Sequence, residues 1–342
     1  NNFMTKKKIL ILGGAGFIGH NLSIYLKNKK FNILCVDNLK INNFHYVKNN
    51  IKDLIKKKLY TNFLNERIDL LKKNKINLIN CDIKNFNKIK KIFDKFRPDV
   101  VVHLAAVSHD NRSNINPRET FENSYVTLFN SLDSSKNFSD KIHFIYFSSS
   151  MVYGNFKKRI VTENENCNPI GVYGSLKLSG ELLIKSFSNV FGINYSIIRP
   201  SALYGERCIS NRVIQIFFER AFFNQKINIM GDGKEKLDFT YIGDLCDGVY
   251  KIIKNLRNSK NQTFNLTYGS SRSINTIKKF VKSKFKNQKF EHLKRNKLVA
   301  IRGTLSVNKA KKLVGYKPIY NIKKGIQKYY EWYEKKFADL SK

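Results

Sequence analysis

The sequence predicts an α/β protein built on a doubly wound parallel sheet, with a smaller mixed lobe formed by C-terminal residues. Short runs of Ile, Val, Leu and Phe alternate with helix-like segments over the first 200 residues, and a glycine-rich turn follows the first run. Such apolar runs are typical of strands that are buried on both faces. Their alternation with helices indicates a parallel sheet that helices cover on both sides.

The predicted elements follow in order along the chain. Strands are expected at Lys8–Leu12, Asn32–Val36, Asn77–Cys81, Val100–Leu104, His143–Phe147 and Tyr195–Ile198. Helices are expected between them, among others at Ile18–Lys27, Phe86–Lys95, Thr120–Ser134 and Ser175–Phe191.

The pattern changes after Pro200, where loops with Gly and Asp, such as residues 231–233, and helices dominate. These helices are expected at Arg212–Phe223, Ile274–Phe285 and Ile322–Lys335, and Thr263–Leu266 is expected to return one strand to the sheet. We therefore expect a sheet domain at residues 5–200, joined by a returning segment at about 239–268. The smaller lobe would comprise residues 201–238 and 269–338.

Composition is typical of a globular protein with a sizeable core, because 342 residues include 42% hydrophobic residues. No apolar run approaches the ~20 residues that a membrane span needs, and the first one ends in glycines rather than in a cleavage site. Five scattered cysteines form no Cys-x-x-Cys pair, which argues against a disulfide framework and a structural zinc site. We expect a cytoplasmic protein that is not attached to a membrane and holds no metal.

The net charge of +37 is the one unusual compositional feature. A basic chain can bind nucleic acid, but here the excess is lysine dispersed over the whole sequence, and clusters such as 56–58 and 88–91 are typical of solvated helix faces. Arginine, which reads phosphates and bases more specifically, is scarce. We therefore expect no nucleic-acid partner, although the charge would attract a small anionic substrate.

The glycine-rich turn predicts a dinucleotide site. Gly14, Gly16 and Gly19 fit Gly-x-Gly-x-x-Gly between a strand and a helix, and Gly13 precedes them. Such a turn lets a pyrophosphate approach the amides at a helix N-terminus. Asp37 ends the second strand eighteen residues past Gly19, and a carboxylate there accepts ribose hydroxyls and repels a 2′-phosphate. The pattern favours NAD over NADP and a Rossmann-type domain; the alternative is a structural turn with an incidental aspartate.

Further residues fit the same groove. They follow the turn or the ends of successive strands, and we assign to the cofactor Phe17, Ile18, Asn38, Asp82, Ile83, Leu104, Ala105, Ala106 and Ser108. Small residues after the fourth strand leave room for the cofactor backbone. His103 lies between Val102 and Leu104 and is expected to pack within its strand rather than act as a base.

Tyr173 and Lys177 are candidates for chemistry because a four-residue spacing places both side chains on one helix face. A nearby ammonium favours the phenolate and lowers the pKa of a tyrosine from its usual ~10. A phenol tuned in this way can move a proton on a substrate hydroxyl. The spacing alone also occurs by chance on ordinary amphipathic helices, so its meaning depends on the rest of the chain.

Taken together, the chain resembles the extended short-chain dehydrogenases/reductases of the nucleotide-sugar epimerase/dehydratase type. The resemblance covers about residues 7–335 and rests on Gly13–Gly19, Asp37, His103–Ala106, Ser149–Gly154, Tyr173-x-x-x-Lys177, Arg199-Pro200 with Tyr204-Gly205, Gly231–Gly233, Asp238-Phe239 with Asp244, and Gly315–Pro318. It implies tightly held NAD, a nucleotide-diphosphate sugar as substrate, and a homodimer.

The resemblance also implies catalytic roles. Tyr173 would be the acid/base, Lys177 would hold the nicotinamide ribose and lower the tyrosine pKa, and Ser149 would bind the sugar hydroxyl that loses its proton. Relatives that dehydrate or decarboxylate tend to place acids after that serine, where this chain has Ser150 and Met151. The resemblance therefore implies an epimerase that oxidises the sugar to a keto sugar, most often at C4, and returns the hydride to the other face. The alternative is a dehydratase, decarboxylase or net oxidoreductase.

The substrate site departs from the family pattern. Ala202 stands where many relatives have Asn, Leu237 with Lys236 beside it stands where many have Arg, and Ser124, next to Asn123, replaces a common Asn. Arg302 lies near the place of a family arginine for the substrate phosphates. We also assign Arg207 to the substrate, and Arg112 either contacts a substrate anion or is a solvated loop residue. These departures leave open which nucleotide and which sugar are bound.

Overall fold

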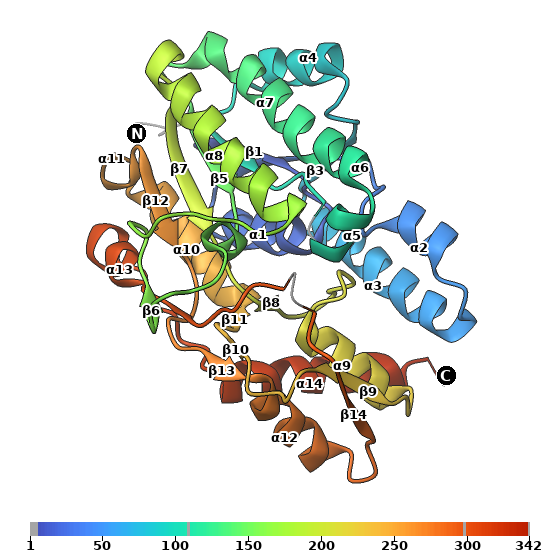
Figure 1. Ribbon diagram of the computed structural model, residues 1–342. Helices are drawn as coiled ribbons and strands as arrows, with labels where there is room; N and C mark the ends of the chain where they lie inside the picture. The colour runs from blue at the N-terminus through green and yellow to red at the C-terminus, as the bar shows by residue number, and fades with distance from the viewer. Residues whose placement is uncertain (1–5, 108–109, 297–298, 341–342) are drawn as a thin grey trace.

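The computed structural model describes residues 6–107, 110–296 and 299–340. Its centre is a sheet of seven parallel strands in the order β12-β7-β5-β4-β1-β2-β3 (Figure 1). The strands are β1 (Lys8–Leu12), β2 (Asn32–Asp37), β3 (Asn77–Asn80), β4 (Val100–His103), β5 (His143–Phe147), β7 (Asn194–Arg199) and β12 (Gln262–Asn265). The order reverses between β1 and β4, and ligands of such sheets bind in the crevice at that point.

Helices cover both faces of the sheet. The principal ones are α1 (Phe17–Asn28), α2 (Phe44–Asn50), α3 (Leu54–Lys73), α4 (Phe86–Phe96), α7 (Thr127–Ser135), α8 (Val172–Phe191) and α10 (Ile242–Lys254), with short helices α5 (Asp110–Ile115), α6 (Pro117–Phe121) and α11 (Leu256–Ser259). Helix α1 packs against α3 and α10, whereas α7 packs against α4 and α8. Figure 1 shows α4, α7 and α8 together above the sheet.

Side-chain alternation along the strands explains the two layers. Ile9 and Ile11 of β1 belong to one hydrophobic core, while Leu10 and Leu12 belong to the core on the opposite face. All four side chains are fully buried. A strand with no exposed face is therefore apolar at every position, which is why the sequence predicts the sheet well.

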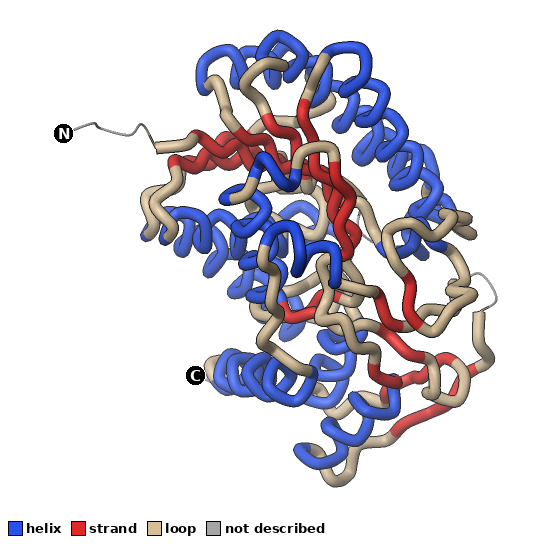
Figure 2. Tube along the Cα trace, turned by 90° about the vertical axis from the view of Figure 1, so that its left-hand side faces the viewer, coloured by secondary structure: helices blue, strands red, loops and turns tan. Residues whose placement is uncertain are grey.

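The later segments gather on one side of the sheet, in the lower part of Figures 1 and 2. They include α9 (Val213–Phe222), α12 (Ile274–Lys284), α14 (Ile322–Ala338) and the short strand pairs β8 (Leu203–Tyr204) with β11 (Thr240–Tyr241), β9 (Ile227–Met230) with β14 (Phe290–Leu293), β10 (Lys236–Leu237) with β13 (Arg272–Ser273), and β6 (Ile160–Val161) with β15 (Thr304–Leu305). Helix α13 (Asn308–Val314) instead packs against α10, α11 and β12 of the sheet domain. Aromatic rings join α9 to α14, where Phe222 stacks on Tyr330 and Tyr333.

The predicted fold class is confirmed: the seven expected strands are all present, each within one residue of its predicted ends. One predicted helix differs. Residues Thr120–Ser134 do not form a single α-helix, because a π-helical turn at Glu122–Val126 separates α6 from α7. The long helix α3 and the helix α10 were not among the predicted elements.

The described ranges contain no helix that is both long and apolar enough to cross a bilayer. In the same ranges no three His, Cys, Asp or Glu side chains are grouped in a way that could hold a metal ion. All five cysteines carry free thiols, and four of them are buried.

Candidate active site

The turn between β1 and α1 is built for close backbone approach. Gly13 has φ +87°, a region that glycine adopts readily, and a Cβ there would lie 3.0 Å from the amide nitrogen of Ala105. A Cβ at Gly19 would collide with the carbonyl oxygen of Gly13. Because these two glycines have no Cβ, the turn can pack closely against its own helix and against the end of β4.

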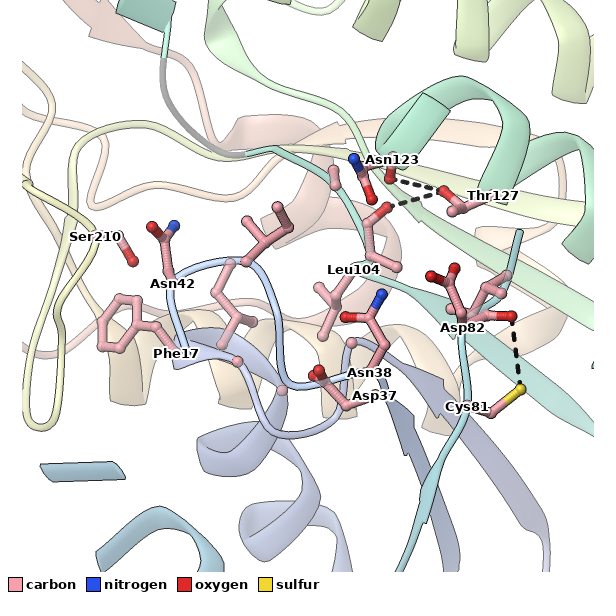
Figure 3. A pocket seen from close by; sticks show the side chains of 18 of the residues that line it. Phe17, Asp37, Asn38, Asn42, Cys81, Asp82, Leu104, Asn123, Thr127 and Ser210 are labelled. Atoms are coloured by element: carbon pink, nitrogen blue, oxygen red, sulfur yellow. Dashed lines mark hydrogen bonds between the residues drawn. The ribbon is translucent and has the colours of Figure 1, made fainter. Parts of the chain in front are cut away.

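A first cavity opens above this turn and has the features of a dinucleotide site. Its lining includes Gly13, Gly16, Phe17, Ile18, Gly19, Asp37, Asn38, Asp82, Ile83, Leu104, Ala105 and Ala106 (Figure 3). The N-cap of α1 offers no side-chain hydrogen bond and its first turn has no acidic residue. The first-turn amides therefore suit a pyrophosphate.

Asp37 lies at the C-terminal end of β2 and is held by two backbone amides. Its carboxylate accepts hydrogen bonds from the amides of Ala15 at 3.0 Å and Leu39 at 2.8 Å. Burial raises the pKa of this carboxyl, and the two amide donors oppose that rise. Figure 3 shows Asp37 and Asn38 in the middle of the cavity, where a carboxylate can receive ribose hydroxyls.

Two arginines support the turn from the side away from the cavity. Arg67 is fully buried and donates to the carbonyl oxygens of Ala15 at 3.2 Å and Arg207 at 2.5 Å. The guanidinium of Arg207 donates to His20 Nε2 at 2.8 Å and pairs with Glu66 at 3.1 Å. Arg207 does not line the cofactor or substrate cavity, so the geometry does not favour its assignment to the substrate.

A second cavity adjoins the first. It is lined by Ser149, Ser150, Met151, Tyr173, Lys177, Ala202, Leu237 and Arg302, among others. Both cavities share Ile18, Leu104, Ala106, Ser210 and Arg212. A ligand in the second cavity would therefore lie directly beside a dinucleotide in the first.

The serine run after β5 is held in place by hydrogen bonds. Ser148 donates to Glu181 Oε1 at 2.5 Å, and Glu181 forms a two-point ion pair with Arg199 at 2.9 and 2.6 Å. Glu181 and Arg199 are both buried. Ser149 caps a short 3₁₀ turn, η3 (Ser150–Tyr153), by accepting from the Met151 amide at 3.2 Å. Its hydroxyl keeps its own proton available for another partner.

Tyr173 and Lys177 lie in the first two turns of α8 and line the same cavity. The Lys177 Nζ is 5.9 Å from the centre of the Tyr173 ring and donates to the Phe147 carbonyl at 2.7 Å. Burial lowers the pKa of Lys177 to about 7, while Glu181 opposes the decrease. A buried ammonium so close to a phenol stabilises the phenolate.

His103 packs within the sheet, as the sequence predicts. It is 1% exposed, and its ring lies 6.1 Å from the rings of both Phe144 and Tyr146. Burial lowers the pKa of His103 to about 3, so the ring is neutral at physiological pH.

Of the remaining predicted residues, three line neither cavity and one lies outside the described residues. Gly14 packs against Cys35 instead of lining the cavity. Arg112 pairs with Glu119 at 2.6 Å outside the two cavities, and Lys236 is exposed next to the cavity-lining Leu237. Ser108 lies outside the described residues.

Sequence reasoning missed several lining residues. Asn42, Asn123, Thr127 and Ser210 line the cofactor cavity (Figure 3), and Arg212 lines both cavities. Most of these positions carry no local signal. Arg212 does, because a cation immediately before an apolar helical run is unfavourable at the positive end of the helix dipole unless an anion accompanies it.

Comparisons with known proteins agree with this geometry. Residues 9–267 match the model of the NAD dependent epimerase/dehydratase family. A protein of Methanocaldococcus jannaschii that is named provisionally as a UDP-glucose 4-epimerase is 31% identical over 330 residues, covering 95% of this chain and 97% of the relative. The UDP-glucuronate 4-epimerase of Thermodesulfobacterium geofontis is 28% identical, covering 94% and 95%.

A solved structure extends the similarity to the whole fold. The UDP-glucuronic acid 4-epimerase of Bacillus cereus, in complex with UDP-glucuronic acid and NAD, superposes with a TM-score of 0.85 at 26% identity, over 96% of this chain and 99% of the other. The chain therefore belongs to the NAD-dependent epimerase/dehydratase family, and its cofactor is NAD.

Proposed function

We propose that this protein is an epimerase of a UDP-linked sugar that inverts C4 through a transient keto sugar. One observation carries the proposal: Ser149, Tyr173 and Lys177 line one cavity that opens into the cofactor cavity, and no Asp or Glu is among the described residues lining it. Loss of water from the sugar would call for an additional proton donor at the leaving hydroxyl, a role that a carboxylic acid can take. Hydride removal and return needs none.

In this mechanism the side chains handle the proton. NAD held by Gly13, Gly16, Gly19 and Asp37 in the first cavity would supply a reversible hydride acceptor beside the sugar. Tyr173 removes the hydroxyl proton as the carbonyl forms and gives it back when the opposite face is reduced. Ser149 keeps its proton and donates a hydrogen bond to the sugar oxygen, and the charge of Lys177 stabilises the phenolate.

The residues that line this cavity are compatible with the turn that the keto sugar must make between the two half-reactions. That lining includes small or flexible side chains, namely Ser150, Met151, Ser201 and Ala202. We propose that these residues confine the sugar without holding one face of it. Arg302, which also lines this cavity, is a candidate for the substrate diphosphate, because guanidinium matches phosphate oxygens well.

The UDP moiety is proposed from the relatives. The relatives from Methanocaldococcus jannaschii, Thermodesulfobacterium geofontis and Bacillus cereus are named as UDP-sugar 4-epimerases, the first of them provisionally. The family description also covers dehydratases, so the product has to be identified directly.

The test is product analysis with UDP-glucose and UDP-glucuronic acid, using the wild type, Tyr173→Phe and the control Tyr250→Phe. Tyr250 is half-buried beside Tyr25 and lies outside the two cavities. The wild type and the control are expected to give a product of unchanged mass, while Tyr173→Phe loses at least about 100-fold in rate. A product lighter by water, carbon dioxide or two hydrogens would refute epimerisation.

We also propose that two copies pair through an apolar stripe on neighbouring helices. Phe121, Tyr125 and Phe129 follow one another at four-residue intervals, and Phe121 and Phe129 are 45% and 46% exposed. On the adjacent α8, Leu182 and Val190 are 58% and 71% exposed. Contiguous apolar surface of this kind is typical of a protein interface.

Leu182→Lys is expected to give monomers in light scattering after gel filtration. The control Ile319→Lys should remain dimeric, because Ile319 is 67% exposed and is hydrogen-bonded to α10, which packs on the other face of the sheet from α7 and α8. A monomeric wild type would contradict the pairing.

We also propose two further features that the sequence predicts. The chain is divided into a cofactor domain and a substrate lobe at the bounds given above, and the protein is located in the cytoplasm.

A further inference from the structure

An arginine at the boundary between the two cavities has no role in the account above. Arg212 lines both cavities. Its guanidinium carbon lies 5.6 Å from the centre of the ring of Phe17, the first residue of α1. Figure 3 shows Phe17 and Ser210, a close neighbour of Arg212 in sequence, at the same end of the cofactor cavity. A positive charge therefore stands over the helix N-terminus that faces the dinucleotide.

Arg212 has no anionic partner within the described parts of the chain. Two other half-buried or buried arginines do: Arg112 pairs with Glu119, and Arg199 pairs with Glu181. The Nε of Arg212 is buried and has no hydrogen-bond partner among the described residues. An unsatisfied buried N–H is costly, by about 1–3 kcal/mol, and so calls for an explanation.

The helix ends around Arg212 also favour an anion in this space. It is the N-cap residue of α9, whose first turn has no acidic side chain. The first turn of α1 across the cavity has none either, and its N-cap is Gly16. Two positive helix ends and a guanidinium thus converge on one space, and each of them favours an anion.

We propose that Arg212 binds a diphosphate where the two cavities meet. The planar guanidinium donates to two oxygens at once, which suits adjacent phosphates better than a single point charge would. Two sources share this chemistry: the pyrophosphate of NAD and the diphosphate of the nucleotide sugar. The second source rests on the proposed function, and the first does not.

The test compares ligand affinities of the wild type, Arg212→Gln and Arg212→Lys by titration calorimetry with NAD, UDP and UMP. Arg220→Gln is the matched control, because Arg220 lies on the same helix α9, lines neither cavity, and donates to the Lys226 carbonyl. Circular dichroism checks that each variant is folded. Arg212→Lys keeps the charge but not the two-point geometry, so an intermediate affinity is expected.

Binding of the substrate diphosphate predicts that Arg212→Gln weakens UDP about tenfold or more, with UMP and NAD within about twofold of the wild type. Binding of the cofactor pyrophosphate predicts the corresponding loss for NAD alone. Unchanged affinity for both NAD and UDP would overturn the proposal, as would an equal loss for UDP and UMP. A wild type that binds NAD but no UDP would refute the nucleotide-sugar function, while the NAD titration would still test Arg212.

Discussion

Lys177→Met is expected to stabilise the NAD-free protein while removing its activity. Lys177 is 5% exposed, and burial lowers its pKa from 10.5 to about 7. That difference corresponds to about 5 kcal/mol, at roughly 1.4 kcal/mol per pH unit. Because the unfolded chain binds the proton more tightly than the folded protein, the penalty on folding is full below pH 7 and declines as the pH rises towards 10.5.

The substitution also removes a favourable contact. Lys177 donates to the Phe147 carbonyl at 2.7 Å, and leaving that oxygen without a donor costs about 1–3 kcal/mol. The net gain at pH 7 is therefore about 2–4 kcal/mol. At pH 10 the penalty in the wild type has nearly disappeared, so the variant should be equally stable or slightly less stable.

Urea unfolding of both proteins at pH 7 and pH 10, after removal of NAD, measures this difference. The control is Lys185→Met, two turns later on the same helix and exposed, which should change stability little at either pH. The reasoning is wrong if the stability difference between Lys177→Met and the wild type is the same at both pH values.

Two further substitutions test residues that hold the two cavities in shape. Glu181→Gln is expected to lower the free energy of unfolding by about 3–5 kcal/mol, because it leaves the buried Arg199 without its counter-charge. Urea unfolding measures this loss, and Glu331→Gln, at an exposed residue, is the control. Gly19→Ala is expected to weaken NAD at least about tenfold in calorimetry, since its Cβ would collide with the turn at the Gly13 carbonyl. Gly192→Ala, where a Cβ meets nothing within 4 Å, should cost only the strain of its positive φ and leave NAD affinity unchanged.

Much of the fold is predictable because its signals are local. Strands such as β1 and β5 are buried on both faces, so all their residues but the first are apolar or aromatic and the run is recognisable without knowledge of its neighbours. The glycine turn is equally local, because its spacing reflects contacts within a single strand–turn–helix unit. Tyr173 and Lys177 are one helical turn apart, so their proximity follows from the helix alone.

The partners of charged residues could not be predicted, because tertiary contacts decide them. Arg207 meets His20 and Glu66, which are 187 and 141 residues away in sequence, and it supports the cofactor turn from behind. Arg112 similarly meets Glu119 outside the cavities. From the sequence alone each arginine is a candidate substrate ligand, because its positive charge is evident whereas the acidic residue that pairs with it cannot be identified.

Helix α3 shows a different limit. Its twenty residues include several lysines interspersed with the buried Leu59, Phe63 and Leu64, so the apolar positions are hard to recognise as one face. Lys56, in a cluster that is typical of a solvated helix surface, in fact pairs with the mostly buried Glu219 at 2.5 Å. Burial of such a lysine depends on α9, which the sequence does not place beside α3.

The central claim is that the inverted carbon loses and regains the same hydride while Tyr173 moves the proton. The direct measurement uses a UDP-sugar with deuterium at C4, turned over by the wild-type protein in ordinary water, with the product analysed by mass spectrometry and NMR. We predict that the C4 epimer retains the deuterium, because the hydride never exchanges with solvent. Replacement of that deuterium by solvent hydrogen would contradict the account.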